Sequence, residues 1–208
     1  MFEMLQKGLY AITPDGKTDN EILEFTEAVL RGGAVLVQYR EKSGIDKIDL
    51  ANQLVTLCHS YNVPLIINDN VKLAETIGAD GVHLGKEDGF ISDARKRLGN
   101  SAIIGVSCYN SLKRAIEAEK QGANYVAFGR FFTSNSKPLA APAEIGTLTA
   151  AKTILTLPIV AIGGILPENG ASLLNAGADI LAVIGGLATK NSELSAQNYS
   201  TLFSKNSH

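Results

Sequence analysis

Polar and basic side chains follow an early apolar run, in the segment Gln38-Tyr39-Arg40-Glu41-Lys42. Side chains alternate along a strand, so Gln38, Arg40 and Lys42 share one face. A face with a guanidinium and an ammonium does not pack against helices, so we expect it to face a cavity, where both groups can bind phosphate oxygens. The alternative is that Arg40 and Lys42 form surface ion pairs with Glu41 or with neighbouring residues.

Two carboxylates and an amide follow two later apolar runs, as Asn68-Asp69 and Asp88. Carboxylate and amide oxygens suit an octahedral Mg²⁺ that is shared with substrate phosphates. Asn and Asp also end strands and cap helices, and alternation places Asn68 and Asp69 on opposite faces unless the strand bends there. The residues alone leave both interpretations open.

Double glycines follow the last two apolar runs, as Gly163-Gly164 and Gly185-Gly186. Glycine lets a ligand approach the backbone closely, so we expect a phosphate bound by N–H groups. Two tight structural turns are the alternative.

A long segment without helix or strand character runs from Phe131 to about Glu144. It carries Ser134, Ser136 and Lys137, two hydroxyls and an adjacent ammonium. Loops of this length in compact folds are often functional covers, although a solvated polar loop is the ordinary alternative.

Histidine and cysteine give little support to acid–base or covalent catalysis. His83 lies inside an apolar run, where we expect a hydrogen-bonded structural imidazole, and Cys108 follows Ser107 with no histidine placed to activate it. The remaining groups suit the movement of a phosphorylated or pyrophosphorylated group by electrostatic stabilisation.

Alternating elements must position these residues. Apolar runs typical of strands cover residues 8–13, 35–40, 64–69, 81–85, 102–108, 125–130, 158–164 and 180–186. Segments with helical spacing cover residues 19–31, 46–61, 71–77, 91–98, 111–121, 146–156, 167–176 and 188–204. Eight such pairs predict an α/β fold, a (β/α)8 TIM barrel with its active site at the carboxyl ends of the strands.

A short repeat supports that count, because Gly-Ala recurs between a helix and the next strand. Glycine is typical where the helix ends with positive φ. The repeat is either a common loop or the trace of a duplicated two-unit module; it reads Gly33-Ala34, Gly78-Ala79-Asp80, Gly122-Ala123-Asn124 and Gly177-Ala178-Asp179.

The bulk composition predicts a single domain over residues 1–208, with the barrel at about 8–204. With 208 residues and a net charge of -2, the chain shows no basic surface for nucleic acid and no segment long enough to span a membrane. Two cysteines without metal-ligand spacing, and no apparent signal peptide, favour a cytoplasmic protein.

These motifs jointly resemble the thiamine-phosphate synthase family, also called thiamine phosphate pyrophosphorylase. The resemblance extends over about residues 8–187 and is specific as a set. It is carried by residues 38–42 (QYREK), 67–69 (IND), 78–88 (GADGVHLGKED), 105–107 (GVS), 128–129 (FG) leading into 134–137 (SNSK), and 161–165 (AIGGI).

The resemblance implies a TIM barrel that joins 4-amino-2-methyl-5-hydroxymethylpyrimidine diphosphate to 4-methyl-5-(2-phosphoethyl)thiazole, giving thiamine phosphate and pyrophosphate. The implied mechanism is dissociative: pyrophosphate leaves, a pyrimidine methylene cation forms, and the thiazole nitrogen attacks it. By position, Asp69 and Asp88 resemble the Mg²⁺ ligands.

The same resemblance assigns the other site residues. The implied diphosphate contacts are Arg40, Lys42, Asn68 and Lys137, and Gln38 and Ser107 would contact the pyrimidine or its leaving group. Of these, Arg40, Lys42, Ser107 and Lys137 would be catalytic. Around the thiazole phosphate would lie Ser134, Ser136, Gly164, Ile184 and Gly185.

The chain departs from the family pattern in two places. The family loop usually has proline and threonine where residues 133–137 read Thr-Ser-Asn-Ser-Lys, and it usually has serine where this chain has Gly185. Both departures bear on affinity for the thiazole phosphate. The oligomeric state is open, a homodimer included.

Two other functions fit the same barrel. A thiazole tautomerase shares the thiazole phosphate pocket but needs no metal-diphosphate site, so Arg40, Asp69, Asp88 and Lys137 favour the synthase. A catalytically inactive barrel that only binds and sequesters a phosphorylated metabolite would not need both candidate metal carboxylates, Asp69 and Asp88.

Overall fold

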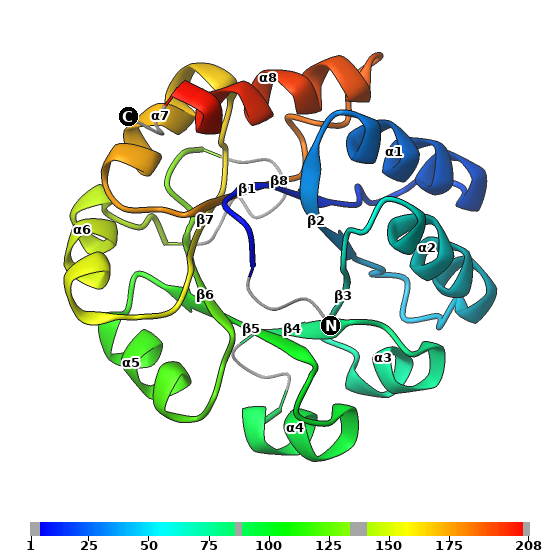
Figure 1. Ribbon diagram of the computed structural model, residues 1–208, viewed down its shortest axis with the longest axis horizontal. Helices are drawn as coiled ribbons and strands as arrows, with labels where there is room; N and C mark the ends of the chain where they lie inside the picture. The colour runs from blue at the N-terminus through cyan, green and yellow to red at the C-terminus, as the bar shows by residue number, and fades with distance from the viewer. Residues whose placement is uncertain (1–4, 86–88, 134–140, 206–208) are drawn as a thin grey trace.

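The described residues form a closed barrel of eight parallel strands surrounded by eight helices (Figure 1). The computed structural model describes residues 5–85, 89–133 and 141–205. The strands are β1 (Gly8–Ile12), β2 (Ala34–Tyr39), β3 (Leu65–Asn68), β4 (Gly81–Leu84), β5 (Ile103–Tyr109), β6 (Tyr125–Gly129), β7 (Ile159–Ile162) and β8 (Ile180–Val183). Each strand pairs in parallel with its neighbours in sequence, and β8 pairs with β1. The predicted TIM barrel is confirmed.

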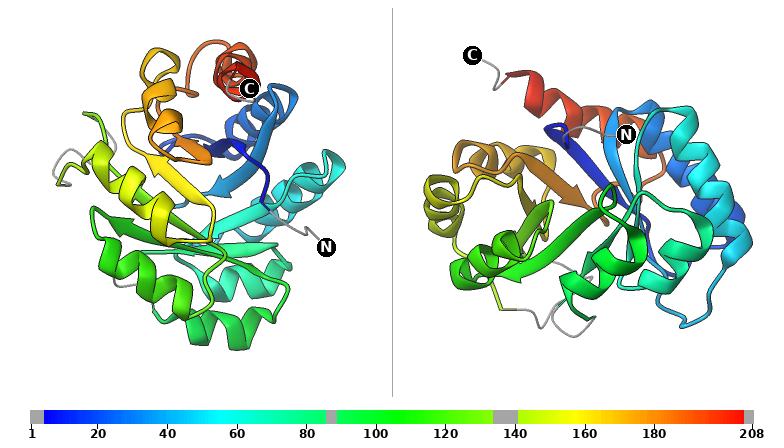
Figure 2. Two further views of the ribbon diagram at one scale, coloured as in Figure 1. Left: turned by 60° about the vertical axis from the view of Figure 1, so that its left-hand side comes forward. Right: turned by 60° about the horizontal axis from the view of Figure 1, so that its bottom comes forward.

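The helices form the outer ring. They are α1 (Asp19–Arg31), α2 (Ile48–Ser60), α3 (Val71–Ile77), α4 (Ile91–Leu98), α5 (Leu112–Lys120), α6 (Ile145–Ile154), α7 (Pro167–Asn175) and α8 (Ser192–Lys205). In Figures 1 and 2, α8 lies between α7 and α1 and closes the ring. Among the described residues, no helix is both long and apolar enough to span a membrane.

The element bounds follow the sequence pattern except near the carboxyl end of the chain. We expected the last helix from Ala188, but α8 begins at Ser192. The side chain of Asn191 accepts a hydrogen bond from the N–H of Leu194 at 3.0 Å, which caps the helix there. The strands β7 and β8 also end before their double glycines, so Gly163-Gly164 and Gly185-Gly186 lie in turns.

Alternate residues of the strands fill the barrel interior with a compact apolar cluster. Tyr10 and Tyr125 are its largest members, and their rings meet edge to face at 5.9 Å between centroids. The Tyr125 ring fits because β5 has Gly105 beside it, where a Cβ atom would lie 1.9 Å from the tyrosine ring. The other strand faces pack against the helices in two further clusters.

The Gly-Ala repeat has a common role at the amino ends of the strands. In three of its copies the third residue, Asp80, Asn124 or Asp179, accepts a hydrogen bond from the backbone N–H of a neighbouring strand at 2.7, 2.8 and 3.1 Å. Each of these side chains also contacts a side chain of an even-numbered helix. The pairs are His59 with Asp80, Arg95 with Asn124, and Lys152 with Asp179.

The first copy differs in detail but uses the same arrangement. The hydroxyl of Ser200 on α8 donates to the carbonyl of Gly32 at 2.9 Å, in the turn before β2. Each two-unit module is therefore tied to the helix that precedes it in the ring, which is the contact pattern expected of a repeated unit.

Candidate active site

A cavity of about 610 Å³ lies at the carboxyl ends of the strands, where barrel active sites are found. Its lining includes residues that the sequence motifs singled out: Gln38, Arg40, Asn68, Asp69, Ser107, Gly164, Ile184 and Gly185. The strand β2 ends at Tyr39, so the alternation does not extend to Lys42, which is exposed and is not part of the lining. The remaining predicted site residues, Asp88, Ser134, Ser136 and Lys137, lie outside the described residues.

Arg40 contributes a buried guanidinium to one side of the cavity. The residue is 6% exposed, and its Nη1 atom forms an ion pair with Asp15. Its Nη2 atom is buried and has no hydrogen-bond partner among the described residues. An unsatisfied buried donor is unfavourable in the free protein, so an anionic ligand in this cavity would complete the arrangement.

The strand bend needed at Asn68-Asp69 is present. Asp69 has a positive φ of 61°, and its N–H donates to the carbonyl of His83 at 2.8 Å. This left-handed conformation breaks the alternation, so both Asn68 and Asp69 line the cavity. The Asn68 amide donates to the Asp69 carboxylate at 2.6 Å, which fixes the orientation of the two side chains.

A chain of hydrogen bonds crosses the floor of the cavity. Gln38 Nε2 donates to the Tyr10 hydroxyl at 2.7 Å, and the Tyr10 and Tyr125 hydroxyls are 2.9 Å apart. His83 lies 2.9 Å from the Tyr125 hydroxyl through Nδ1 and 2.8 Å from Ser107 Oγ through Nε2. The imidazole is hydrogen-bonded as expected, and it also lines the cavity.

The direction of this chain is fixed at one end, where the Gln38 amide donates to the Tyr10 hydroxyl. The Tyr10–Tyr125 contact can run either way, and the His83 tautomer sets which of its two ring nitrogens donates. Burial raises the pKa of both tyrosines well above 10, which keeps their hydroxyls protonated.

Four glycines form the opposite side of the cavity; we call Gly163, Gly164, Gly185 and Gly186 the glycine cradle. The N–H groups of Gly164, Gly185 and Gly186 donate no hydrogen bond within the described residues. Backbone donors that line a cavity and lack internal acceptors suit an anion.

The lining also contains Tyr109 and Arg130, which the sequence motifs did not include. Tyr109 has a positive φ of 57° after a register shift in β5, and the guanidinium of Arg114 lies 5.9 Å from its ring. Arg130 directly follows β6 and lies between the motif at residues 128–129 and the polar segment 134–137. The sequence feature that could have identified Arg130 is its position directly after an apolar run, which it shares with the other site residues.

The described thiols do not support covalent catalysis. Cys58 and Cys108 are buried and free, and burial raises the pKa of each to about 12. A thiol with that pKa is almost entirely protonated at neutral pH.

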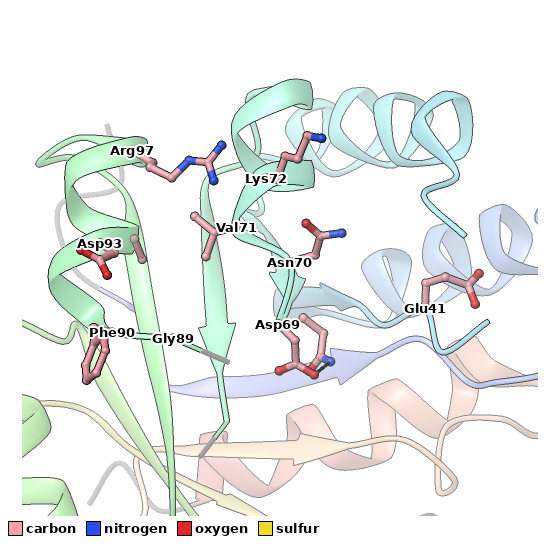
Figure 3. A pocket seen from close by; sticks show the side chains of 11 residues that line it. Glu41, Asp69, Asn70, Val71, Lys72, Gly89, Phe90, Asp93 and Arg97 are labelled. Carbon is pink, nitrogen blue, oxygen red and sulfur yellow. Dashed lines mark hydrogen bonds between the residues drawn. The ribbon is translucent and has the colours of Figure 1, made fainter. Parts of the chain in front are cut away.

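A second cavity of about 510 Å³ opens between α3 and α4 and shares Asn68 and Asp69 with the first (Figure 3). Its charged lining mixes signs, with Glu41 and Asp93 facing the same space as Lys72 and Arg97. This mixture does not select an anion, so the larger cavity is the better candidate site.

The described residues contain no group of three or more His, Cys, Asp or Glu side chains placed to hold a metal ion. Asp88, the second predicted ligand, lies outside these residues. Asp69 supplies a carboxylate at the cavity wall, with the Asn68 amide beside it. These hard oxygen donors fit Mg²⁺ in chemistry.

Residues 9–187 match the family model described as thiamine monophosphate synthase. The chain belongs to this family. It is 51% identical over 180 residues to the thiamine-phosphate synthase of Methylococcus capsulatus, covering 86% of this chain and 80% of the relative. It is 50% identical over 200 residues to that of Methylobacillus flagellatus, covering 95% of each. Among solved structures, thiamine phosphate pyrophosphorylase from Pyrococcus furiosus superposes with a TM-score of 0.85 at 29% identity, covering 97% of each chain.

Proposed function

We propose that this chain is a transferase that makes thiamine phosphate. It joins 4-amino-2-methyl-5-hydroxymethylpyrimidine diphosphate to 4-methyl-5-(2-phosphoethyl)thiazole and releases pyrophosphate. The observation that carries the proposal is a single cavity with two separate sets of anion-binding donors, the buried Arg40 guanidinium and the glycine cradle. Family membership and relatives of about half-identical sequence support it.

In the diphosphate half, Arg40 contacts the diphosphate through its unsatisfied Nη2 atom, and Asn68 lies beside it in the cavity lining. We assign Lys42 and Lys137 to the same group, although Lys42 is exposed in the structure and Lys137 lies outside the described residues. These cations stabilise the negative charge that grows on the leaving diphosphate.

Asp69 and Asp88 are the proposed Mg²⁺ ligands. When bound, Mg²⁺ supplies positive charge to the diphosphate oxygens and makes the diphosphate a better leaving group. The hydrogen bond from Asn68 holds the Asp69 carboxylate in one orientation within the cavity.

The reaction breaks the bond between the pyrimidine methylene carbon and the diphosphate oxygen, and the electron pair leaves with the diphosphate. The thiazole nitrogen then forms a bond to the methylene carbon. Gln38 and Ser107 contact the pyrimidine or the leaving group, and the hydrogen-bonded floor holds both side chains in place. Neither step needs a strong base, which agrees with a described lining whose one imidazole is held by structural hydrogen bonds.

In the thiazole half, the phosphate binds to the N–H groups of Gly164 and Gly185, which donate no hydrogen bond to another described residue. Ile184 contributes an apolar wall next to them. We assign the hydroxyls of Ser134 and Ser136, outside the described residues, to the same phosphate.

The direct test is to incubate the protein with both substrates and Mg²⁺ and to measure thiamine phosphate and pyrophosphate in equal amounts. Omission of the pyrimidine diphosphate separates the tautomerase, which would isomerise the thiazole alone. Binding of either substrate without any product would instead indicate a sequestering barrel. Either of these two results contradicts the proposal.

We further propose a cytoplasmic location, which the two free, buried cysteines support, and small-molecule substrates as the only partners apart from a second copy of the chain. Light scattering coupled to gel filtration tests the homodimer.

A further inference from the structure

Two arginines on opposite sides of the barrel line the 610 Å³ cavity. Of the lysine and arginine side chains in the described ranges, Arg40 and Arg130 are the two in its lining. Arg40 follows β2 and Arg130 follows β6, and these strands are four positions apart in a closed ring of eight (Figure 1). The two residues therefore serve different halves of the cavity.

The backbone of Arg130 packs directly against the glycine cradle. Gly129 pairs with Ile162, so Arg130 lies next to Gly163, where a Cβ atom would be 2.3 Å from the Arg130 Cβ atom. The following backbone stays beside the turn after β7, since the N–H of Phe132 donates to the carbonyl of Gly163 at 3.0 Å.

The other side of Arg130 is also held. Its carbonyl accepts a hydrogen bond from the N–H of Ala143 at 2.7 Å, and the residue is partly buried. A residue with its backbone fixed between two segments presents its side chain to the cavity with a small loss of conformational entropy on binding.

The charges of the cavity are divided in the same way. The described carboxylate of the lining, Asp69, follows β3 and lies beside Asn68 in the diphosphate half. The glycine cradle offers neutral N–H donors and carries no side chain that could add a charge. A phosphate monoester carries close to two negative charges at neutral pH, so a guanidinium beside the cradle would supply a countercharge that neutral N–H donors do not.

We propose that Arg130 is a further substrate-binding residue, which binds the phosphate of the thiazole substrate as Arg40 binds the diphosphate on the opposite side. The inference rests on the proposed function, and it assigns to this chain a specificity contact for the phosphorylated form of the thiazole over its unphosphorylated alcohol.

The test compares Arg130→Gln, Arg130→Lys and the wild type in steady-state kinetics with each substrate varied in turn. Arg130→Gln should raise KM for the thiazole phosphate about 10- to 100-fold, the scale of one charge-assisted hydrogen-bonding group. KM for the pyrimidine diphosphate should stay within about two-fold of the wild type. For Arg130→Lys, KM for the thiazole phosphate should lie between the values of the wild type and Arg130→Gln, because lysine keeps the charge but lacks the planar guanidinium group.

A truncated substrate makes the test specific. The thiazole alcohol lacks the phosphate, so kcat/KM for it should be nearly equal in the wild type and in Arg130→Gln. Arg31→Gln is the matched control: Arg31 lies at the end of α1 in exposed ion pairs with Glu27 and Glu193, and its loss changes the net charge equally.

Three results would overturn the inference. One is an unchanged KM for the thiazole phosphate, and another is a rise confined to the pyrimidine diphosphate. The third is a fall in kcat and melting temperature with the preference for phosphate intact, which indicates a structural role. If Arg130→Gln does not fold, Arg130→Lys decides by the same preference. An inactive wild type would refute the proposed function itself, whereas an active wild type with an unchanged variant refutes this inference alone.

Discussion

The two ends of the barrel differ in how completely their polar groups are satisfied. At the amino ends of the strands, Asp80, Asn124 and Asp179 each bind a strand N–H and a helix side chain. At the carboxyl ends, a buried guanidinium atom of Arg40 has no partner in the described chain, and Asp69 has a left-handed backbone. The polar groups of the first end satisfy one another, whereas the second end keeps a buried donor that a ligand can satisfy.

The largest effect should come from Asp69→Asn, which keeps a residue that tolerates the left-handed conformation. Loss of the carboxylate should lower turnover about 10²-fold or more, the scale of a strong electrostatic contact. The melting temperature should stay close to that of the wild type, because no strand N–H is released. Steady-state rates over a Mg²⁺ titration check this; wild-type turnover with unchanged Mg²⁺ dependence would contradict the metal assignment.

Arg40→Gln should also lower turnover by about 10²-fold, yet without a loss of stability. The variant removes a buried donor that is unsatisfied, while Asp15 is exposed enough to remain hydrated. Chemical denaturation should therefore give an unfolding free energy equal to or above the wild type. A clear decrease would mean that the ion pair with Asp15 is mainly structural.

Arg95→Met should produce the opposite result at the other end of the barrel. Arg95 donates to four backbone carbonyls and to the Asn124 side chain, at 2.6 to 3.2 Å. Its loss should reduce the unfolding free energy by about 2 kcal/mol. Turnover per folded molecule should not change, and a loss of turnover at full stability would show that the two ends are not independent.

Asp179→Asn should flatten the acid dependence of stability. Burial acts to raise the pKa of Asp179, but hydrogen bonds from Lys152, the N–H of Ile159 and Lys7 outweigh it, so the pKa lies below 3.8. The ionised Asp179 carboxylate thus stabilises the folded state fully at pH values above its ordinary pKa of 3.8, and this stabilisation is lost as the pH falls through the lowered pKa. Urea unfolding should show the wild type about 1 kcal/mol more stable than the variant near pH 6, with the difference shrinking below about pH 4. A constant difference would argue against linkage at this residue.

The smallest effect should come from Gly185→Ser. A Cβ atom at Gly185 meets nothing within 4 Å, so the serine hydroxyl should fit and lower KM for the thiazole phosphate about three-fold. The matched change Gly186→Ser places its Cβ atom 2.1 Å from the Tyr199 hydroxyl, which binds the Ile165 carbonyl, and should destabilise the fold. Equal effects of the two variants on KM would contradict this arrangement of the cradle.

Much of this architecture could be predicted because periodicity determines which face a side chain occupies. Alternation predicted correctly that Gln38 and Arg40 face the cavity, and the Gly-Ala repeat predicted the positive φ of Gly78 and Gly122. The roles of the site residues remain predictions for the kinetic tests above.

The rest depends on features without a periodic signal. A left-handed residue such as Asp69 depends on a contact with the next strand, the N–H bond to His83, which no local pattern encodes. The place of Arg130 beside Gly163 depends on the pairing of two strands about thirty residues apart in the chain. Such positions follow from topology once the barrel is assembled.

The ties between even-numbered helices and the turns before β2, β4, β6 and β8 also make the barrel divisible into quarters. Each boundary between quarters combines strand pairing and helix packing with one such tie, formed by His59, Arg95, Lys152 or Ser200. A quarter taken from a related barrel would therefore have to match the strand register and the helix packing as well as the tie. Hybrid barrels cut at these boundaries would exchange the carboxyl-end loops as whole units, with the tie as the contact that is easiest to redesign.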